Sequence, residues 1–95
     1  MKQPCVYILA SKRNGTLYVG VTSNLAQRVW QHREHVVDGF TAKYGADRLA
    51  WYELHESMES AIAREKRLKA GNRASKIALI EAGNPEWKDL FPDIV

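Results

Sequence analysis

Five residues of the chain are of types from which phosphodiester cleavage can be built: Tyr7, Tyr18, Arg28, His32 and Glu65. Cleavage needs a positioned nucleophile, stabilisation of the charge that grows on the phosphate, and help for the leaving oxygen. An arginine presents a planar fork that matches phosphate oxygens, and one carboxylate with water and substrate oxygens suits Mg²⁺. A tyrosine, with an ordinary pKa of about 10, becomes a base only when a metal or a cation lowers that pKa. A histidine can act as a second proton carrier.

Both tyrosines fall in runs that are typical of β-strands. Residues 5–10 and 16–22 are rich in β-branched and apolar side chains, and Asn14-Gly15 between them is a strong hairpin signal because both residues tolerate positive φ. If the turn has an even number of residues, antiparallel pairing places Tyr7 and Tyr18 on the same face of the sheet.

The remaining elements are predicted from helix caps, glycines and apolar periodicity. A first helix runs from about residue 25 to 36 or 37, with Asn24 as its N-cap and Asp38-Gly39 after it, and an irregular connection over 40–47 leads to a strand over 48–55. A second helix begins after Ser57 and runs to about Ala70, before Gly71-Asn72, and a third spans roughly 73–81 and is ended by Gly83 and Pro85. The tail over 86–95 packs back through Trp87, Leu90 and Phe91. The order β-β-α-β-α-α predicts an α+β domain, with a three-stranded, mostly antiparallel sheet flanked by helices.

Polar residues interrupt the apolar face of the first helix. That face is defined by Leu25, Val29 and Val36, and Arg28 and His32 lie on or beside it. A cation and an imidazole placed there need partners, because unpaired buried polar groups are costly. Taken alone, His32 is typical of a hydrogen-bonded structural histidine, and Arg28 of an arginine whose charged end reaches the surface.

The second helix carries a similar exception. Its apolar face is formed by Met58, Ala61, Ile62 and Leu68. Glu65 falls inside this face, and glutamate is rarely buried without a partner. Glu65 therefore either pairs with a cation such as Arg28 or holds a metal ion. Three such polar residues on two helices, together with two tyrosines on one sheet face, predict a functional site.

The composition is that of a globular protein. The chain has 95 residues, of which 45% are hydrophobic and 26% charged, and this predicts one domain over residues 1–95. Its single cysteine, Cys5, excludes an internal disulfide and a cysteine-based zinc site. Because no apolar run approaches about 18 residues and no signal-peptide pattern is present, we expect a soluble, cytoplasmic protein with no membrane partner.

Basic residues are concentrated in one segment, although the net charge of the chain is only +3. The residues of this basic cluster are Arg64, Lys66, Arg67, Lys69, Arg73 and Lys76, and Glu65 is the only acidic residue among them. Such a cluster can bind a polyanion, of which the phosphate backbone of nucleic acid is the commonest. It can also be a solvated helix face.

Two short motifs and three single residues occur in an order that is typical of one family. The motifs are Cys5-Val6-Tyr7 and Tyr18-Val19-Gly20, and the single residues are Arg28, His32 and Glu65. On these residues the chain resembles the GIY-YIG endonuclease superfamily, and within it the small single-domain bacterial group, over about residues 4–90. It departs from the usual pattern at Cys5, where glycine is usual, and at Val6 and Val19, where isoleucine is usual.

The resemblance implies a role for each matched residue. Tyr18 would be the general base or its relay, and Tyr7 its hydrogen-bonding partner. Arg28 would bind the scissile phosphate, and Glu65 would hold a single Mg²⁺ or Mn²⁺ ion. Such families often also use an asparagine late in the chain, for which Asn84 is the first candidate and Asn72 the second. The implied catalytic set is therefore Tyr7, Tyr18, Arg28, His32 and Asn84.

The resemblance also implies a metal-dependent endonuclease that acts on DNA. Relatives in homing, restriction and repair usually add domains that choose the target, and none is present in this sequence. We therefore expect structure-selective or weakly specific cleavage, with target choice left to a protein partner or to a second copy of the chain. The alternatives are a non-catalytic nucleic-acid-binding module with the same fold, and an interaction module in which Glu65 and Arg28 form a structural ion pair.

Overall fold

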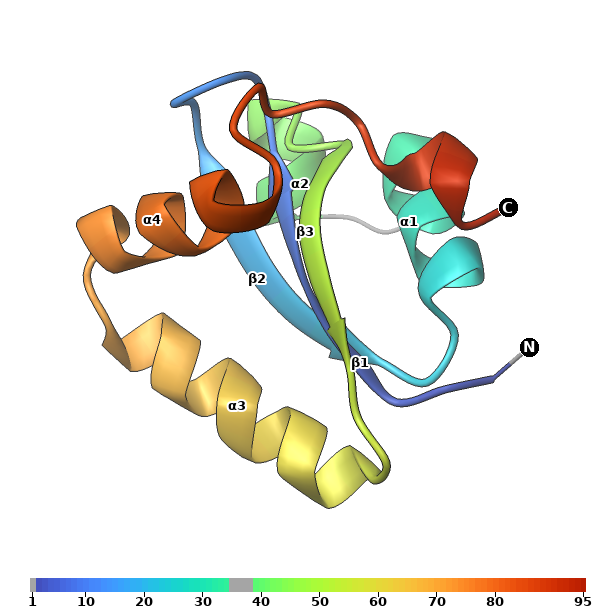
Figure 1. Cartoon of the computed structure of the whole chain (residues 1–95). Helices are drawn as coiled ribbons and strands as arrows, with labels where there is room; N and C mark the ends of the chain where they lie inside the picture. The colour runs from blue at the N-terminus through green and yellow to red at the C-terminus, as the bar shows by residue number, and fades with distance from the viewer. Residues whose placement is uncertain (1, 35–38) are drawn as a thin grey trace.

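The central layer of the protein is a three-stranded antiparallel sheet, seen in a computed structural model that describes residues 2–34 and 39–95 (Figure 1). The strands are β1 (Cys5–Ala10), β2 (Leu17–Thr22) and β3 (Arg48–Leu54), and their order across the sheet is β2-β1-β3. β1 therefore lies in the middle of the sheet, and β2 lies at an edge. The predicted α+β class with an antiparallel sheet is confirmed.

The β1–β2 hairpin brings the two tyrosines to one face of the sheet. Its connection covers residues 11–16, an even number, and its register pairs Leu9 with Tyr18 and Tyr7 with Gly20. Because alternate residues of a strand point to the same side, Tyr7 and Tyr18 share a face. This prediction is confirmed.

The Asn14-Gly15 pair works differently from the prediction. Only Asn14 adopts a positive φ, of 58°, and the Gly15 N–H donates to the Lys12 carbonyl at 2.9 Å. Gly15 is needed for space, because a Cβ at this position would collide with the Ser11 hydroxyl and lie 2.8 Å from Lys12 Cγ. The turn therefore depends on positive φ at one residue and on the missing side chain of the other.

Helices and the C-terminal tail cover the two faces of the sheet (Figure 1). α3 (Met58–Ala70) packs against β2 and β1, and α4 (Arg73–Gly83) packs against β3. α1 (Leu25–Arg33) packs on the opposite face with Leu90, Phe91 and Ile94 of the tail, whereas Trp87 of the tail is buried on the face of α3 and α4. Every residue of β1 is buried because alternate side chains enter two cores, with Val6, Ile8 and Ala10 toward α3 and α4, and Cys5, Tyr7 and Leu9 toward α1.

Three helices begin at a side-chain cap. Asn24, Ser57 and Asn72 each accept a hydrogen bond from the backbone N–H three residues further on, at 3.2, 3.2 and 2.8 Å. Such a cap satisfies a donor that the first turn of a helix leaves unpaired. The predicted starts of α1 and α3 are confirmed.

The first helix ends earlier in the structure than the sequence predicts. α1 ends at Arg33, and the N–H of its C-cap, Glu34, donates back to the carbonyls of His32 and Trp30. The predicted end at Val36 or Val37, and Asp38 after it, fall on residues 35–38, which lie outside the described residues.

The predicted irregular connection contains a short helix, α2 (Phe40–Tyr44). Gly39 is its N-cap, and Gly45 ends it in the left-handed region with a φ of 65°. The prediction of irregular structure is therefore wrong for these residues. A helix this short is too brief to show an apolar period in the sequence, and glycines at both ends favoured a loop.

The C-terminal tail packs back on the sheet, as predicted. Trp87 is fully buried, and its indole N–H donates to Glu81 at 2.7 Å. Asp89 accepts hydrogen bonds from Arg33 of α1 at 2.6 Å and from the Leu49 N–H of β3 at 3.2 Å. Burial acts to raise the pKa of Asp89, but a hydrogen bond from the Phe91 N–H at 3.1 Å, together with these two bonds, outweighs burial and lowers that pKa. The chain ends just after a 3₁₀ turn, η1 (Phe91–Asp93).

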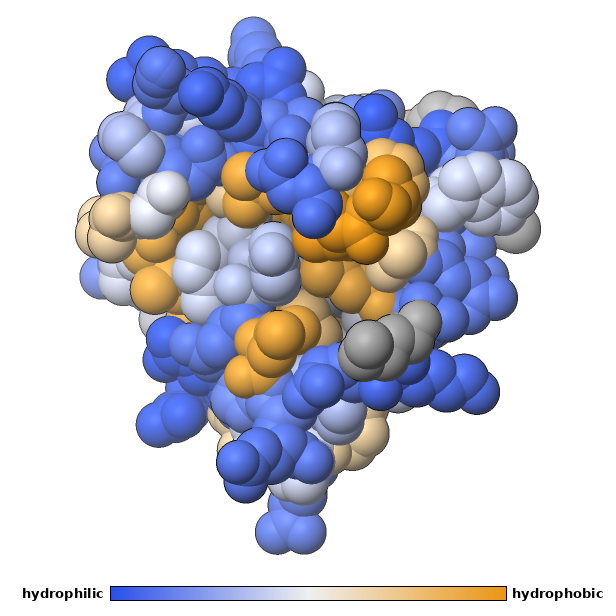
Figure 2. Space-filling view, turned by 45° about the vertical axis from the view of Figure 1, so that its right-hand side comes forward, coloured by the Kyte–Doolittle hydropathy of each residue, from blue (hydrophilic) through white to orange (hydrophobic). Residues whose placement is uncertain are grey.

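The surface on the side of α1 and the tail is mixed in character. Figure 2 turns this side toward the viewer and shows apolar patches separated by hydrophilic side chains. A cavity of about 310 Å³ lies there, lined by Leu25, Tyr52, Leu54, Asp93 and Ile94 among others. None of the helices in the described residues combines the length and the apolar character that crossing a membrane requires.

Candidate active site

Three aromatic side chains meet on the α1 face of the sheet: Tyr7 from β1, Tyr18 from β2 and His32 from α1. The ring centroids are 6.3 Å apart for the two tyrosines, 6.1 Å for Tyr7 and His32, and 5.5 Å for Tyr18 and His32. Tyr7 Oη lies 3.2 Å from His32 Nε2, and His32 Nδ1 lies 2.8 Å from Thr41 Oγ1 on α2. Both ring nitrogens are therefore hydrogen-bonded, which fixes the imidazole that holds the Tyr7 hydroxyl.

Gly20 provides the space that the Tyr7 ring occupies. It lies directly opposite Tyr7 in the hairpin register. A Cβ at Gly20 would lie 2.5 Å from Tyr7 Cζ and closer still to the hydroxyl oxygen. A side chain at this position would push the Tyr7 hydroxyl away from His32. The glycine of the Tyr18-Val19-Gly20 motif is therefore required by a tyrosine on the neighbouring strand.

The surroundings of Tyr7 and His32 set their protonation. Burial raises the pKa of Tyr7 well above its ordinary value, and the neighbouring Tyr18 adds to this rise. The charge of Arg28 lowers the pKa of Tyr7, whereas that of Glu65 raises it. The pKa of His32 is lowered, first by burial and then by the Arg28 charge. Near neutral pH the Tyr7 hydroxyl keeps its proton and His32 is uncharged.

Arg28 brings a positive charge to this cluster from α1. It is half-buried and lies one turn before His32. Among residues 2–34 and 39–95, its side chain has no hydrogen-bond or ion-pair partner. The alternative in which Arg28 pairs with Glu65 is therefore not seen. The guanidinium is available to an anion, and its planar fork matches phosphate oxygens.

Glu65 brings a negative charge from α3. Its side chain is 15% exposed, and its Oε2 lies 3.1 Å from the Nζ of Lys69, one turn further along the helix. The Lys69 side chain is 53% exposed. A pair of this kind contributes only a few tenths of a kcal/mol, so Glu65 can readily exchange Lys69 for another cation.

A metal ion at Glu65 would have few protein ligands. In the part of the chain that the structure describes, no group of three or more His, Cys, Asp or Glu side chains could hold a metal. Zinc, which usually takes three or four nitrogen or sulfur ligands, does not fit this donor set. Mg²⁺ and Mn²⁺ do fit, because hard cations accept carboxylate, water and phosphate oxygens together.

Asn84 is not brought to the tyrosines. It is the C-cap of α4, and its buried amide nitrogen donates to the carbonyls of Ala50 at 3.1 Å and Lys88 at 2.9 Å. Its amide oxygen accepts the Lys88 N–H at 3.0 Å. These bonds tie α4 to β3 and to the tail. Asn72, the second candidate, is the N-cap of α4, so both asparagines have structural contacts away from the tyrosine cluster.

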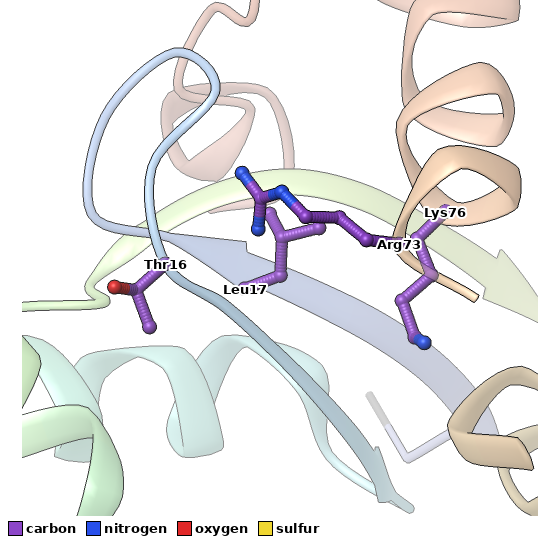
Figure 3. Close-up of a pocket in the computed structure, with 4 residues that line it drawn as sticks. All are labelled: Thr16, Leu17, Arg73 and Lys76. Carbon is purple, nitrogen blue, oxygen red and sulfur yellow. The ribbon is translucent and has the colours of Figure 1, made fainter. Parts of the chain in front are cut away.

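Three residues of the basic cluster lie along β2, the strand that carries Tyr18. Lys69 and Lys76 line a cavity of about 300 Å³ together with Leu17, Tyr18 and Val19. Arg73 and Lys76 line an adjoining cavity of about 310 Å³ with Thr16 and Leu17 (Figure 3). The structure thus places Lys69, Arg73 and Lys76 beside the strand that carries Tyr18.

The other three members of the basic cluster lie elsewhere. The Arg64 Nε–H donates to Glu53 at 3.1 Å, and Glu53 belongs to β3, at the opposite edge of the sheet from β2. Lys66 and Arg67 are exposed on α3 and line neither of the two cavities beside β2. The fold does not place these three residues beside Tyr18.

Two contributions to the site were not predicted from the sequence. Thr41 contacts His32 from a segment that was expected to be irregular, and a lone threonine there carries no distinctive signal. Gly20 is part of a predicted motif, but its function depends on the strand register that places it opposite Tyr7.

Comparison with known proteins agrees with this arrangement. Residues 3–78 match a family model described as the GIY-YIG catalytic domain. A UPF0213 protein of Syntrophus aciditrophicus is 36% identical over 90 residues, which cover 90% of this chain and 98% of the relative. A UPF0213 protein of Clostridium perfringens is 34% identical over 77 residues, which cover 81% and 82%.

A solved structure is similar as well. The solution NMR structure of a UPF0213 protein from Bacillus halodurans has a TM-score of 0.55 and 28% identity, and the match covers 90% of this chain and 92% of that one. The family match contains both tyrosine motifs and the residues Arg28, His32 and Glu65. The chain thus belongs to the GIY-YIG catalytic domain family, whose fold is of the nuclease type.

Proposed function

We propose that this chain is a divalent-metal-dependent endonuclease that hydrolyses phosphodiester bonds in DNA, with structure-selective or weakly sequence-specific action. The observation that supports this most directly is the clustering of Tyr7, Tyr18 and His32 within reach of the opposite charges of Arg28 and Glu65. A packed structural core has no need for an unneutralised guanidinium beside two tyrosines.

In the proposed reaction, Arg28 binds a non-bridging oxygen of the scissile phosphate. The Tyr18 oxygen accepts a proton from the attacking water and passes its own proton to solvent as the water oxygen bonds to phosphorus and the bond to the leaving oxygen breaks. The leaving oxygen is then protonated from solvent. Tyr7 keeps its own proton, and with His32 it holds the site in position. A divalent cation on Glu65 would supply positive charge for the phosphate and the leaving oxygen.

A non-catalytic nucleic-acid-binding module is the second candidate. It is favoured by one observation, the Glu65–Lys69 ion pair, which already gives the carboxylate a cationic partner. In that case Arg28 and the lysines beside β2 would bind phosphates without any chemistry.

The deciding experiment incubates purified protein with nicked, branched and single-stranded DNA, and with matched RNA, in Mg²⁺, in Mn²⁺ and in EDTA. Cleavage that needs the metal and is lost in Glu65→Gln supports the nuclease. The matched control is Glu59→Gln, an exposed glutamate in the first turn of the same helix. Binding without cleavage under every condition supports the binding module, and neither binding nor cleavage overturns both.

We also propose that target choice comes from a protein partner or from a second copy of the chain. Sedimentation of the protein with and without a cleavable DNA tests the second copy. A dimer that forms on DNA supports pairing for a double-strand cut, whereas a single protein on each cleaved DNA contradicts it.

A further inference from the structure

Two cavities adjoin along the outer edge of the sheet. They share Leu17 and Lys76 in their linings, and together they form what we call the β2 groove, lined by Thr16, Leu17, Tyr18, Val19, Lys69, Arg73 and Lys76. Figure 3 shows Arg73 extending from the start of α4 across Leu17, with the Lys76 side chain beside it. Tyr18 belongs both to this groove and to the ring cluster with Tyr7 and His32. The groove and the candidate active site therefore meet at Tyr18, on the edge strand of the sheet.

The groove combines an apolar wall with cations, and this combination is complementary to the base and the anionic phosphate of a nucleotide. Leu17, which is partly exposed, offers apolar surface on which a base or a sugar can pack. Val19 beneath it is buried, and Tyr18 borders the groove with its ring on the α1 face of the sheet. Lys69 and Lys76 lie beside that surface, and Arg73 joins Lys76 one cavity further along. Volumes of about 300 and 310 Å³ fall at the lower end of ligand sites.

The cations of the groove retain free donors for phosphate. Lys76 uses one donor of its ammonium on the Gly71 carbonyl at 3.0 Å. Arg73 uses one terminal nitrogen on the carbonyls of Asn14 and Gly15, at 2.7 and 2.6 Å, which also holds the hairpin tip against α4. An ammonium has three donors and a guanidinium five, so both side chains can bind an anion in addition.

The cavity on the α1 side of the sheet, described with the fold, lacks these features. It has a similar volume, about 310 Å³, but the side chains that line it include no lysine or arginine and do include Asp93. An acidic side chain repels phosphate. The combination of apolar surface and cations thus distinguishes the β2 groove, which lies along the edge strand that carries Tyr18.

Resting on the proposed function, we infer that the β2 groove binds an unpaired nucleotide that flanks the scissile phosphate. Its base or sugar packs on Leu17, and its phosphates contact Lys69, Lys76 and Arg73. A base inside a duplex is stacked on both faces and cannot enter such a cavity, whereas an unpaired base can. The preferred substrate class is then a duplex with a single-stranded segment next to the cleavage point.

The test measures binding in EDTA, so that cleavage does not interfere. Fluorescence anisotropy gives the Kd for a labelled blunt DNA duplex and for the same duplex with a single-stranded overhang. The wild type is expected to bind the overhang about 10-fold more tightly, the order of gain expected when one base packs on apolar surface beside cations. The double variant Lys69→Gln/Lys76→Gln is expected to lose this preference while retaining its binding to the blunt duplex within about 3-fold.

The control Lys2→Gln/Lys88→Gln removes the same charge from two exposed lysines that line neither cavity of the groove, and it should keep the preference. Circular dichroism melts check that all variants fold. Equal affinity of the wild type for the two duplexes, or an equal loss on both in the groove variant, overturns the inference. If the protein cleaves DNA in a metal-dependent way but lacks that preference, the proposed nuclease function is retained and only the nucleotide site is rejected. Absence of binding to either duplex overturns both.

Discussion

Tyr7 and Gly20 face each other across the β1–β2 pair, and the tyrosine ring fills the space of the side chain that position 20 lacks. Gly20→Ala is therefore expected to displace the Tyr7 hydroxyl from His32, to lower the free energy of unfolding by roughly 1–3 kcal/mol, and to slow cleavage. Thermal melting and single-turnover rates measure the two effects. Gly83→Ala is the control, because an added Cβ there meets nothing within 4 Å. A Gly20→Ala protein with the wild-type melting temperature and rate would show that Tyr7 can shift freely.

Glu65→Gln is expected to abolish metal-dependent cleavage and to leave the fold intact. Within the described part of the chain, the carboxylate is paired only with the half-exposed Lys69, so its loss should change the free energy of unfolding by less than about 1 kcal/mol. Cleavage assays in Mg²⁺ and urea unfolding test both halves of the prediction. Residual cleavage at the wild-type rate would rule out the metal-ligand role, and a loss of several kcal/mol would identify a structural ion pair instead.

Tyr18→Phe is expected to lower the cleavage rate by at least 100-fold, the contribution that general base catalysis typically makes, with little change in DNA affinity. Tyr7→Phe should slow cleavage less, since Tyr7 keeps its proton and acts through His32. It should also cost roughly 1 kcal/mol of stability by removing a buried hydrogen bond. Single-turnover kinetics and binding in EDTA separate the two effects. Equal rates for both variants and the wild type would leave the two tyrosines without a catalytic role.

His32 makes the fold sensitive to mild acid. Its pKa in the folded protein lies below the ordinary 6.5, so the unfolded chain takes up this proton at a higher pH than the folded protein does. The stability associated with neutral His32 is present above about pH 6.5 and is lost as the pH falls toward the folded pKa. Urea unfolding at about pH 7.5 and about pH 5 should show this loss, and His32→Asn should reduce it.

An NMR titration of the His32 ring provides the direct check. The titration midpoint should lie below 6.5, since burial and the Arg28 charge both disfavour the imidazolium. Arg28→Gln should move the midpoint upward by removing one of these two causes. A midpoint at or above 6.5 in the wild type would contradict the neutral state on which the role of Tyr7 depends.

The parts of the structure that follow from local signals could be predicted from the sequence. Asn24 and Ser57 begin helices because their side chains bond the first turn, and such caps can be read from neighbouring residues. The partners of Thr41 and Asn84 could not be assigned. Ala50 lies 34 residues from Asn84 in the sequence, and Thr41 reaches His32 from a helix that was not predicted. An asparagine that joins α4 to β3 looks the same in the sequence as one that binds substrate.

The apolar face predicted for the second helix was only partly right, for a related reason. Ala61 is buried and Leu68 packs against the core, but Met58 and Ile62 are exposed. α3 packs against β2 and β1 through only part of this stripe, and no element covers the exposed Met58 and Ile62 side chains among the described residues. Helical periodicity predicts which residues share a stripe; how much of it is covered depends on where the helix meets its neighbours.

The lysines beside β2 also affect how copies of this protein meet in solution. β2 is an edge strand, and among the described residues no further strand pairs with its outer side. An open edge can pair with the edge of another molecule and lead to aggregation. Lys69 and Lys76 lie along this edge, and their like charges repel a second copy that approaches in that way. The charge that attracts phosphate thus also keeps the molecules apart, and a variant that loses nucleic-acid binding through these lysines should become less soluble as well.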